Sequence, residues 1–191
     1  MKKESMILPA ILLCIICLVT TGLVALTFTM TLDARNEQQI IKANANRQQL
    51  CPQAVSFEQI SLTEIQTAAG LTEAYTAKDA DGQTIAWLFT AQSRGYGGQV
   101  PLSLAIDPAG KITGLKILDN SETPGLGKKV AGTAFYGQFV GQSIGQTFTT
   151  KDDADQQPID AIAGATISSN AVTGAVNAVV DFYQKNLSEV K

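Results

Sequence analysis

A long apolar stretch near the N-terminus divides this chain into two physically different parts. From Met6 to Leu32 the chain has no charged residue and consists mainly of Ile, Leu, Val and Thr. A helix of this length reaches about 40 Å, because each residue adds about 1.5 Å, and so can cross a lipid bilayer with some tilt. We therefore predict a membrane-spanning helix over residues 6–32, followed by a soluble part.

The charges that flank the apolar stretch predict its orientation. Lys2 and Lys3 precede it, and Asp33 follows it. Because cytoplasmic flanks of membrane helices are rich in Lys and Arg, we expect residues 1–5 in the cytoplasm and the rest outside the cell (inner) membrane, in the periplasm. The alternative is a cleaved signal peptide, but its apolar core is usually only about 7–15 residues long. Residues 32–34 (Leu-Asp-Ala) also make a poor cleavage site.

The residues beyond the apolar stretch are sufficient for one soluble domain. Residues 33–52 are polar and rich in helix-forming residues, so we expect them to continue the helix outward as a stalk that ends at Pro52. Residues 53–191 then remain for the domain, which is long enough to bury a hydrophobic core.

Alternating apolar residues predict an antiparallel sheet in this domain. Two hairpins are expected, with turns at Asp79–Gly82 and Asp107–Gly110. The fold class is therefore α+β: a single N-terminal transmembrane helix plus a twisted antiparallel sheet with packed helices. The predicted strands are 73–77, 83–91, 102–106, 112–118, 147–150 and 159–162, and the predicted helices are 62–69, 129–140 and 169–186. Ser168, Ser169 or Asn170 is expected to cap the last helix.

The composition excludes several classes of function. The chain contains no His, which excludes a His-ligated metal or haem and a Ser-His-Asp triad. Its net charge is −3 and it has no basic run, so we expect no nucleic-acid partner. The acidic loop 152–155 lacks the glycine and distal Glu of a calcium-binding hand, so we expect no metal site there. Cys51 is the only thiol outside the apolar stretch, which leaves no disulfide within the domain.

The most informative motif lies just before the last predicted helix, over Asp160-Ala161-Ile162-Ala163-Gly164-Ala165-Thr166. A hydroxyl at Thr166 would lie at the positive end of a helix dipole, beside backbone N–H groups that favour a phosphate. Gly164 and Ala165 add little bulk, so a large ligand could approach the backbone closely. Taken alone, the motif also fits an ordinary turn of small residues before a helix.

A second motif, Glu122-Thr123-Pro124-Gly125-Leu126-Gly127, precedes it by about forty residues. Residues 123–126 have the residue types of a type II turn, with proline second and glycine third. Gly125 and Gly127 would let a flat ligand approach the backbone, and Glu122 offers an acceptor. Two lysines, at 128 and 129, add positive charge nearby.

The Asp160–Thr166 motif resembles the flavinylation motif of the FMN-binding domain family, Asp-x-x-Ser/Thr-Gly-Ala-Thr, although Ala163 stands where Ser or Thr is usual. The Glu122–Gly127 string is similar to a hallmark of one branch of that family. Together with the apolar stretch, the stalk and the Gly-Tyr-Gly-Gly segment at 95–98, the pattern resembles the G subunit of the Rnf ion-translocating oxidoreductase complex. The C subunit of the Na⁺-translocating NADH:quinone reductase is a related protein.

This resemblance implies a covalent FMN, held by a phosphoester on Thr166, in an electron-carrier subunit of a membrane-bound ferredoxin:NAD oxidoreductase that moves Na⁺ or H⁺. Alone, such a subunit would have little or no activity. The implied partners are the other Rnf subunits and an ApbE-type flavin transferase. A free-standing anchored flavoprotein, a C-type quinone-reductase subunit and a binding module without flavin remain as alternatives.

The resemblance also implies which residues surround the flavin. Asp160 would present the motif to the transferase, and residues around Thr166 would accommodate the phosphate. Trp87 is expected to serve core packing rather than the flavin. The residues expected near the phosphate are Gly164, Ala165 and Ser168, and those expected near the ring are Glu122, Thr123, Gly125, Leu126, Gly127 and Tyr96.

Overall fold

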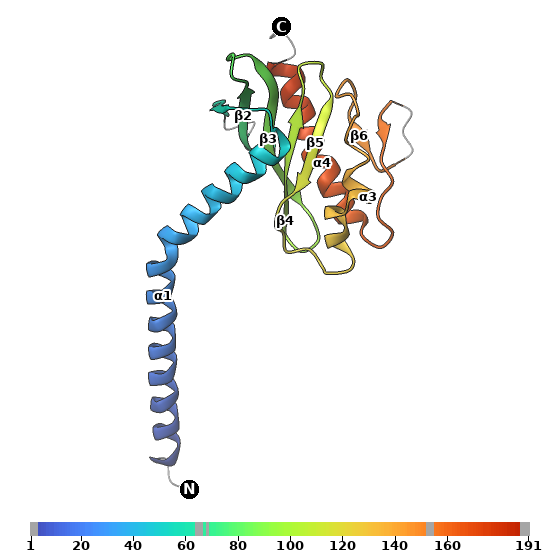
Figure 1. Cartoon of the computed structure of the whole chain (residues 1–191). Helices are drawn as coiled ribbons and strands as arrows, with labels where there is room; N and C mark the ends of the chain where they lie inside the picture. Colours follow the sequence, from blue (N-terminus) through green and yellow to red (C-terminus); the bar gives the residue numbers. More distant parts are fainter. Residues whose placement is uncertain (1–3, 64–66, 68, 152–154, 188–191) are drawn as a thin grey trace. The chain divides into compact units, whose positions relative to one another are not determined.

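A computed structural model of the chain describes residues 4–63, 67, 69–151 and 155–187 (Figure 1). The chain divides into two compact units, Met1–Ala45 and Asn46–Lys191. Residues 64–66 and 68 of the predicted helix 62–69, and residues 152–154 of the acidic loop 152–155, lie outside the described residues.

The first unit is formed by helix α1, which spans Glu4–Leu50 and continues into the start of the second unit. From Ile7 to Leu32 nearly all of its side chains are exposed. The hydroxyls of Thr20, Thr27 and Thr31 donate to carbonyls one turn earlier, so these polar groups are satisfied within the helix. Among the described residues, α1 is the one helix long and apolar enough to cross a membrane.

The second unit is built on a five-stranded antiparallel sheet in the order β1-β2-β3-β4-β5. Both predicted hairpins are confirmed, and in each turn an aspartate side chain binds the backbone in the same way. Asp79 Oδ1 accepts hydrogen bonds from two backbone N–H groups of its turn, and Asp107 Oδ1 does the same. The strands are β1 (Ser56–Gln59), β2 (Leu71–Lys78), β3 (Thr84–Arg94), β4 (Gln99–Ile106) and β5 (Ile112–Ile117).

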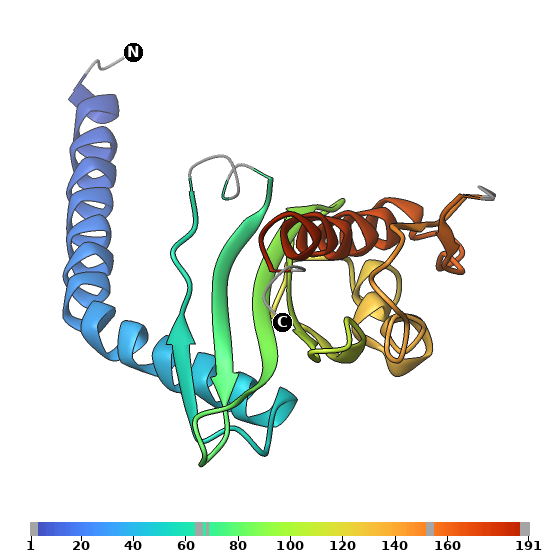
Figure 2. The same ribbon diagram turned by 90° about the horizontal axis from the view of Figure 1, so that it is seen from above.

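One face of the sheet is covered by helix α4 (Thr166–Asn186), which packs against β3 and β4 (Figures 1 and 2). Trp87 meets Tyr183 edge to face, with ring centroids 5.3 Å apart, so its predicted role in the core is confirmed. The predicted apolar face of the helix is buried throughout: Val172, Ala175, Val176, Val179, Val180 and Tyr183.

The buried residues on the opposite face of the sheet are mostly small, with Leu88 as the exception. Ala77 pairs with Ala86 across β2 and β3, and Leu88 pairs with Ala105 across β3 and β4. Cys51, just after α1, belongs to this second cluster. Burial raises the pKa of the Cys51 thiol, which keeps it protonated and poorly nucleophilic.

The predicted helix 129–140 is wrong as a single element. A 3₁₀ helix, η1 (Gly127–Ala131), is followed by a short helix, α3 (Thr133–Tyr136). Gly132 separates them because its backbone is extended, with φ −82° and ψ 144°. Glycine costs a helix interior about 1 kcal/mol relative to alanine, so a break there is inexpensive.

The predicted strand 159–162 is displaced toward the N-terminus. Strand β7 (Gln157–Pro158) pairs in parallel with β6 (Phe148–Thr149), and the last backbone bond of this pairing runs from Ile159 N to Thr149 O. The chain then leaves the sheet because the Asp160 peptide bonds to the side chain of Gln138 instead.

Candidate functional site: a pocket at the start of helix α4

A pocket of about 520 Å³ lies at the N-terminus of α4, and we call it the helix-start pocket. Its volume falls within the usual range for cofactor sites. Three segments that are distant in the sequence form its walls: the loop between β3 and β4, the loop before η1, and the first turn of α4. The lining residues are Tyr96, Glu122, Thr123, Leu126, Gly127, Gly164, Ala165, Thr166, Ile167 and Ser168.

Thr166 is the first residue of α4 and is exposed to the pocket. The first backbone bond of the helix runs from Ser169 N to Ala165 O, so the N–H groups of residues 166–168 precede the intrahelical ladder. These N–H groups and the helix dipole favour an anion beside the Thr166 hydroxyl. The site therefore has the chemical features that a phosphoester on Thr166 requires.

The predicted start of this helix and its cap are wrong. The helix begins three residues before Ser169, and the residue that precedes it, Ala165, makes no side-chain cap bond. The Ser169 hydroxyl donates to Ala165 O and accepts a hydrogen bond from Ile162 N. It therefore fixes the loop before the helix and leaves the N–H groups of the first turn uncapped.

Gly164 takes a left-handed backbone conformation, with φ +78°. A Cβ atom at this position would lie 3.0 Å from Leu126 Cδ2 on the opposite wall. Both features favour glycine here, so the Gly-Ala-Thr order has a geometric reason.

Glu122 connects the three walls of the pocket. Glu122 is 2% exposed, and its carboxylate accepts hydrogen bonds from Gly97 N (2.8 Å) and from the Ser168 hydroxyl (2.5 Å). Both carboxylate oxygens are therefore engaged by the protein itself. Glu122 and Ser168 both line the pocket, and these bonds assign their polar atoms to holding the walls together.

Two nearby glycines, Gly127 and Gly97, leave the space that Glu122 and its neighbouring backbone occupy. A Cβ atom on Gly127 would collide with the Glu122 carboxylate and lie 2.7 Å from the Ser168 hydroxyl. A Cβ atom on Gly97 would collide with the Ser121 carbonyl. Gly125 behaves differently, because it is the third residue of the predicted type II turn, with φ +78° and a bond from Leu126 N to Thr123 O. It does not line the pocket.

The rim of the pocket carries three exposed apolar side chains: Tyr96, Leu126 and Ile167, which are 75%, 43% and 55% exposed. Sequence reasoning missed Ile167. The sequence position of Ile167 could have indicated this role, because the residue that directly follows Thr166 in the first turn of the helix must lie close to Thr166. A rim of this kind provides apolar surface for a flat aromatic ligand.

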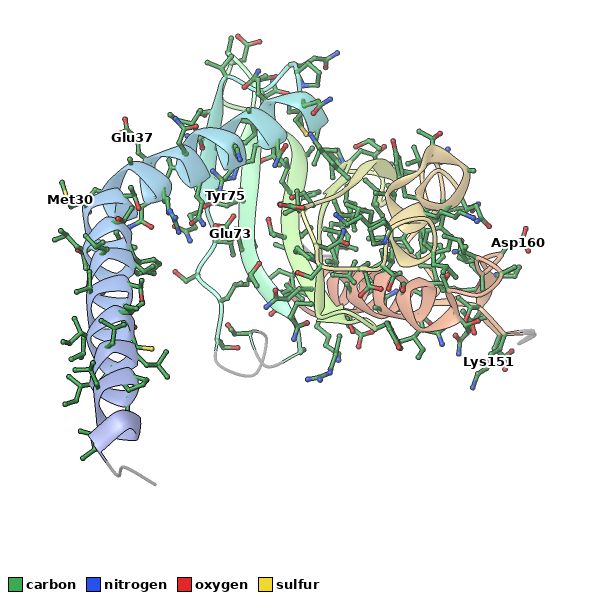
Figure 3. The ribbon with its side chains drawn as sticks, turned by 90° about the horizontal axis from the view of Figure 1, so that it is seen from below. Met30, Glu37, Glu73, Tyr75, Lys151 and Asp160 are labelled. Atoms are coloured by element: carbon green, nitrogen blue, oxygen red, sulfur yellow. The ribbon has the colours of Figure 1, made fainter. Side chains whose placement is uncertain are left out.

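Asp160 lies apart from the helix-start pocket. Its side chain is exposed and projects outward from the loop before α4 (Figure 3). Its backbone is held at two points, because Asp160 N donates to Gln138 Oε1 (2.8 Å) and Gln138 Nε2 donates to Asp160 O (3.2 Å). Asp160 lines a neighbouring pocket of about 530 Å³.

The fold and the pocket define an FMN-binding domain, and residues 95–181 match the model of that family. Residues 1–50 match the model of the RnfG N-terminal region. The chain belongs to the family of G subunits of the ion-translocating oxidoreductase complexes, the Rnf family.

Curated relatives match over nearly the whole chain. The chain is 31% identical to the G subunit of the proton-translocating ferredoxin:NAD(+) oxidoreductase complex of Clostridium ljungdahlii, over 88% of this chain and 86% of the relative. It is 32% identical to the G subunit of the Na(+)-translocating ferredoxin:NAD(+) oxidoreductase complex of Acetobacterium woodii, over 94% and 91%.

Solved structures support the fold. The C subunit of the Na(+)-translocating NADH-quinone reductase from Parabacteroides distasonis matches with a TM-score of 0.52 and 24% identity, over 66% of this chain and 67% of that chain. NqrC of Shewanella oneidensis matches with a TM-score of 0.50 and 18% identity, over 74% of each chain.

Proposed function

We propose that this chain is the electron-carrier subunit of an ion-translocating ferredoxin:NAD oxidoreductase and that it carries FMN covalently on Thr166. The observation that carries the proposal is the position of Thr166. Its exposed hydroxyl lines a cofactor-sized pocket at a helix N-terminus, within the family's FMN-binding domain. Relatives named as G subunits of such complexes support the assembly.

The attachment is a phosphoryl transfer. An ApbE-type transferase would supply FAD, and the Thr166 oxygen would bond to the phosphorus of the FMN half as the pyrophosphate bond breaks. AMP would be the leaving group, and the hydroxyl proton would pass to the transferase. On the chain's side, the N–H groups of residues 166–168 stabilise the phosphate charge, and Gly164 leaves room for it.

When bound, the flavin ring supplies the redox chemistry, and the chain supplies position and surroundings. Leu126, Ile167 and Tyr96 provide apolar surface at the rim, while Thr123 and Gly127 line the wall. Glu122 fixes the walls relative to one another through its bonds to Gly97 N and the Ser168 hydroxyl. A covalent bond keeps the cofactor on the protein in a compartment from which a dissociated flavin would be lost.

Each segment of the chain has a place in this proposal. Residues 1–5 are cytoplasmic, 6–32 span the membrane, 33–52 form the stalk, and 53–191 form the extracytoplasmic FMN-binding domain. The spanning segment contains no charged residue, so the ion crosses the membrane through other subunits. This chain contributes a link in the electron path.

Peptide mass spectrometry tests the attachment. The full chain is co-expressed with a flavin transferase, and the peptide containing Thr166 is expected to gain the mass of one esterified FMN. The Thr166→Ala variant is expected to lose both this mass and the in-gel flavin fluorescence. Thr123→Ala is the matched control, because it removes another exposed threonine hydroxyl of the same pocket and should keep the ester.

Three outcomes would contradict parts of the proposal. Fluorescence that persists in Thr166→Ala would refute the attachment site. A native chain without added mass would leave an anchored binding module without flavin. A flavinylated chain that purifies from native membranes without integral redox subunits would favour a free-standing carrier.

A further inference from the structure

A single charge lies in the wall of the helix-start pocket. Glu122 is the one acidic or basic residue among the described residues that line this pocket. Both oxygens of its carboxylate accept hydrogen bonds, Oε1 from Gly97 N and Oε2 from the Ser168 hydroxyl, so the group is ionised in this arrangement. The pocket wall therefore carries one negative charge.

Among the described residues, no Lys or Arg forms an ion pair with this carboxylate. The ion pairs in that part of the chain join Arg47 to Glu73, Lys78 to Glu58 and Lys185 to Asp181. Glu122 is 2% exposed, and a Cβ atom on either Gly95 or Gly127 would collide with its carboxylate, so backbone packs directly against the group. The charge is thus surrounded by protein atoms, without a counter-ion and with almost no contact with water.

The two hydrogen bonds of Glu122 do not require a charge. A glutamine side chain at this position has the same shape: its Oε1 would accept from Gly97 N, and its Nε2 would donate to Ser168 Oγ. Burial of an unpaired carboxylate costs more free energy than burial of an amide. The contact between the walls therefore accounts for the hydrogen bonds of Glu122 but not for its charge.

We propose that the charge of Glu122 lowers the reduction potential of the FMN on Thr166. This inference rests on the proposed function, because it assumes a flavin in this pocket. Two electrons from the donor of the complex and one proton from water leave an oxidised flavin ring with one negative charge, which a carboxylate in the same pocket opposes. The effect is large because charges interact more strongly within a protein than in water. A low potential suits a carrier between ferredoxin and NAD, because it keeps the electrons transferable to the next acceptor.

Redox titration of the flavinylated full chain tests this role. Wild type and Glu122→Gln are co-expressed with a flavin transferase and purified in detergent micelles. Each is titrated with dithionite against a dye of known potential, while the flavin absorbance is followed. Glu122→Gln removes the charge and keeps a partner for both Gly97 N and the Ser168 hydroxyl. We expect the equilibrium constant for two-electron reduction to rise about tenfold or more, and each factor of ten raises the midpoint potential by about 30 mV.

Asp119→Asn is the matched control. It also removes one carboxylate charge close to Glu122 in the sequence, but Asp119 is exposed and does not line the pocket. Water and salt screen an exposed charge, so the equilibrium constant should stay within about twofold of wild type. Equal potentials in wild type and Glu122→Gln would overturn the proposal. So would an equal rise in both variants, since the effect would then not depend on the buried position of Glu122.

Ser168→Ala separates the charge of Glu122 from the geometry of the pocket walls. This variant removes one of the two hydrogen bonds and keeps the carboxylate. We expect no rise in the midpoint potential. A rise like that expected for Glu122→Gln would show that the position of the walls sets the potential, and it would overturn the proposal. The same measurement decides the question if Glu122→Gln folds poorly. A wild-type chain that carries no FMN would instead refute the proposed function.

Discussion

At the scale of single residues, Glu122 contributes most to the shape of the helix-start pocket. It is a buried carboxylate in a wall that also contains Thr123 and Gly127, and its two oxygens bond to Gly97 N and the Ser168 hydroxyl. A buried charge is tolerated only where hydrogen bonds compensate for lost hydration. The Glu-Thr-Pro-Gly-Leu-Gly string therefore has a structural reason independent of any ligand.

Removal of this carboxylate is expected to destabilise the second unit. Glu122→Ala leaves the buried Ser168 hydroxyl without its acceptor, at a cost of about 1–3 kcal/mol, and also removes the bond from Gly97 N. The free energy of unfolding can be measured with urea on the full chain in micelles, using the fluorescence of Trp87, the only tryptophan. Glu58→Ala is the control, because its ion pair with Lys78 is exposed and should contribute at most about 1 kcal/mol. Equal stability of the two variants would contradict the role of Glu122.

Gly164 offers a test that separates backbone strain from contact within the pocket. Gly164→Ala and Gly82→Ala both place a side chain at positive φ, +78° and +77°, so each should lose about 1 kcal/mol of stability. Only the Cβ at 164 meets another wall, at Leu126. We expect slower FMN attachment in Gly164→Ala alone, measured by in-gel fluorescence over time. The same attachment rate in both variants would show that the Leu126 contact is unimportant.

At the scale of elements, side-chain amides replace missing strand partners. Asn177 of α4 accepts a hydrogen bond from Phe148 N and donates one to Phe148 O, both 2.8 Å long, and so attaches β6 to the helix. The side-chain amide of Gln138 likewise accepts a hydrogen bond from Asp160 N and donates one to Asp160 O. The short strands and the loop before α4 are thus fixed by bonds between distant residues.

Asn177→Asp should loosen β6. The carboxylate can still accept from Phe148 N, but it has no donor for Phe148 O, so the free energy of unfolding should fall by about 1–3 kcal/mol. Hydrogen exchange at the Phe148 amide should accelerate locally. Lys185→Ala serves as the control on the same helix, because its pairing with Asp181 is exposed. Unchanged protection of the Phe148 amide in Asn177→Asp would contradict this account.

The elements that could be predicted from the sequence are those with a local signal. The hairpins follow from alternating apolar residues and from Asp79 and Asp107 at their turns, and the core face of α4 follows from its helical periodicity. The break at Gly132 and the early end of β7 could not be predicted, because they depend on extended backbone and on the distant Gln138 side chain. In the site, the residue types at 122 and 168 were recognised, but their bond to each other spans 46 positions.

At the scale of the whole molecule, the chain combines a helix that contains an uncharged apolar segment with an FMN-binding domain. The hydroxyls of Thr20, Thr27 and Thr31 in the apolar segment bond within the helix, and the segment carries no charged residue. The function proposed for the chain follows from this division: the helix anchors, and the domain holds the electron carrier on one side of the membrane. Which side it faces is set by the charges that flank the helix.

Thiol labelling in spheroplasts tests this orientation. In a chain whose three cysteines are replaced by serine, Lys42→Cys introduces one thiol at an exposed position beyond the apolar segment. A membrane-impermeant maleimide should label it in intact spheroplasts. The matched variant, Ser5→Cys, lies before the segment and should be labelled only after lysis. The opposite pattern would place the domain in the cytoplasm and would remove the argument that the ester exists to retain the flavin. Labelling of neither thiol before lysis would have the same consequence, because both ends of the helix would then be inside.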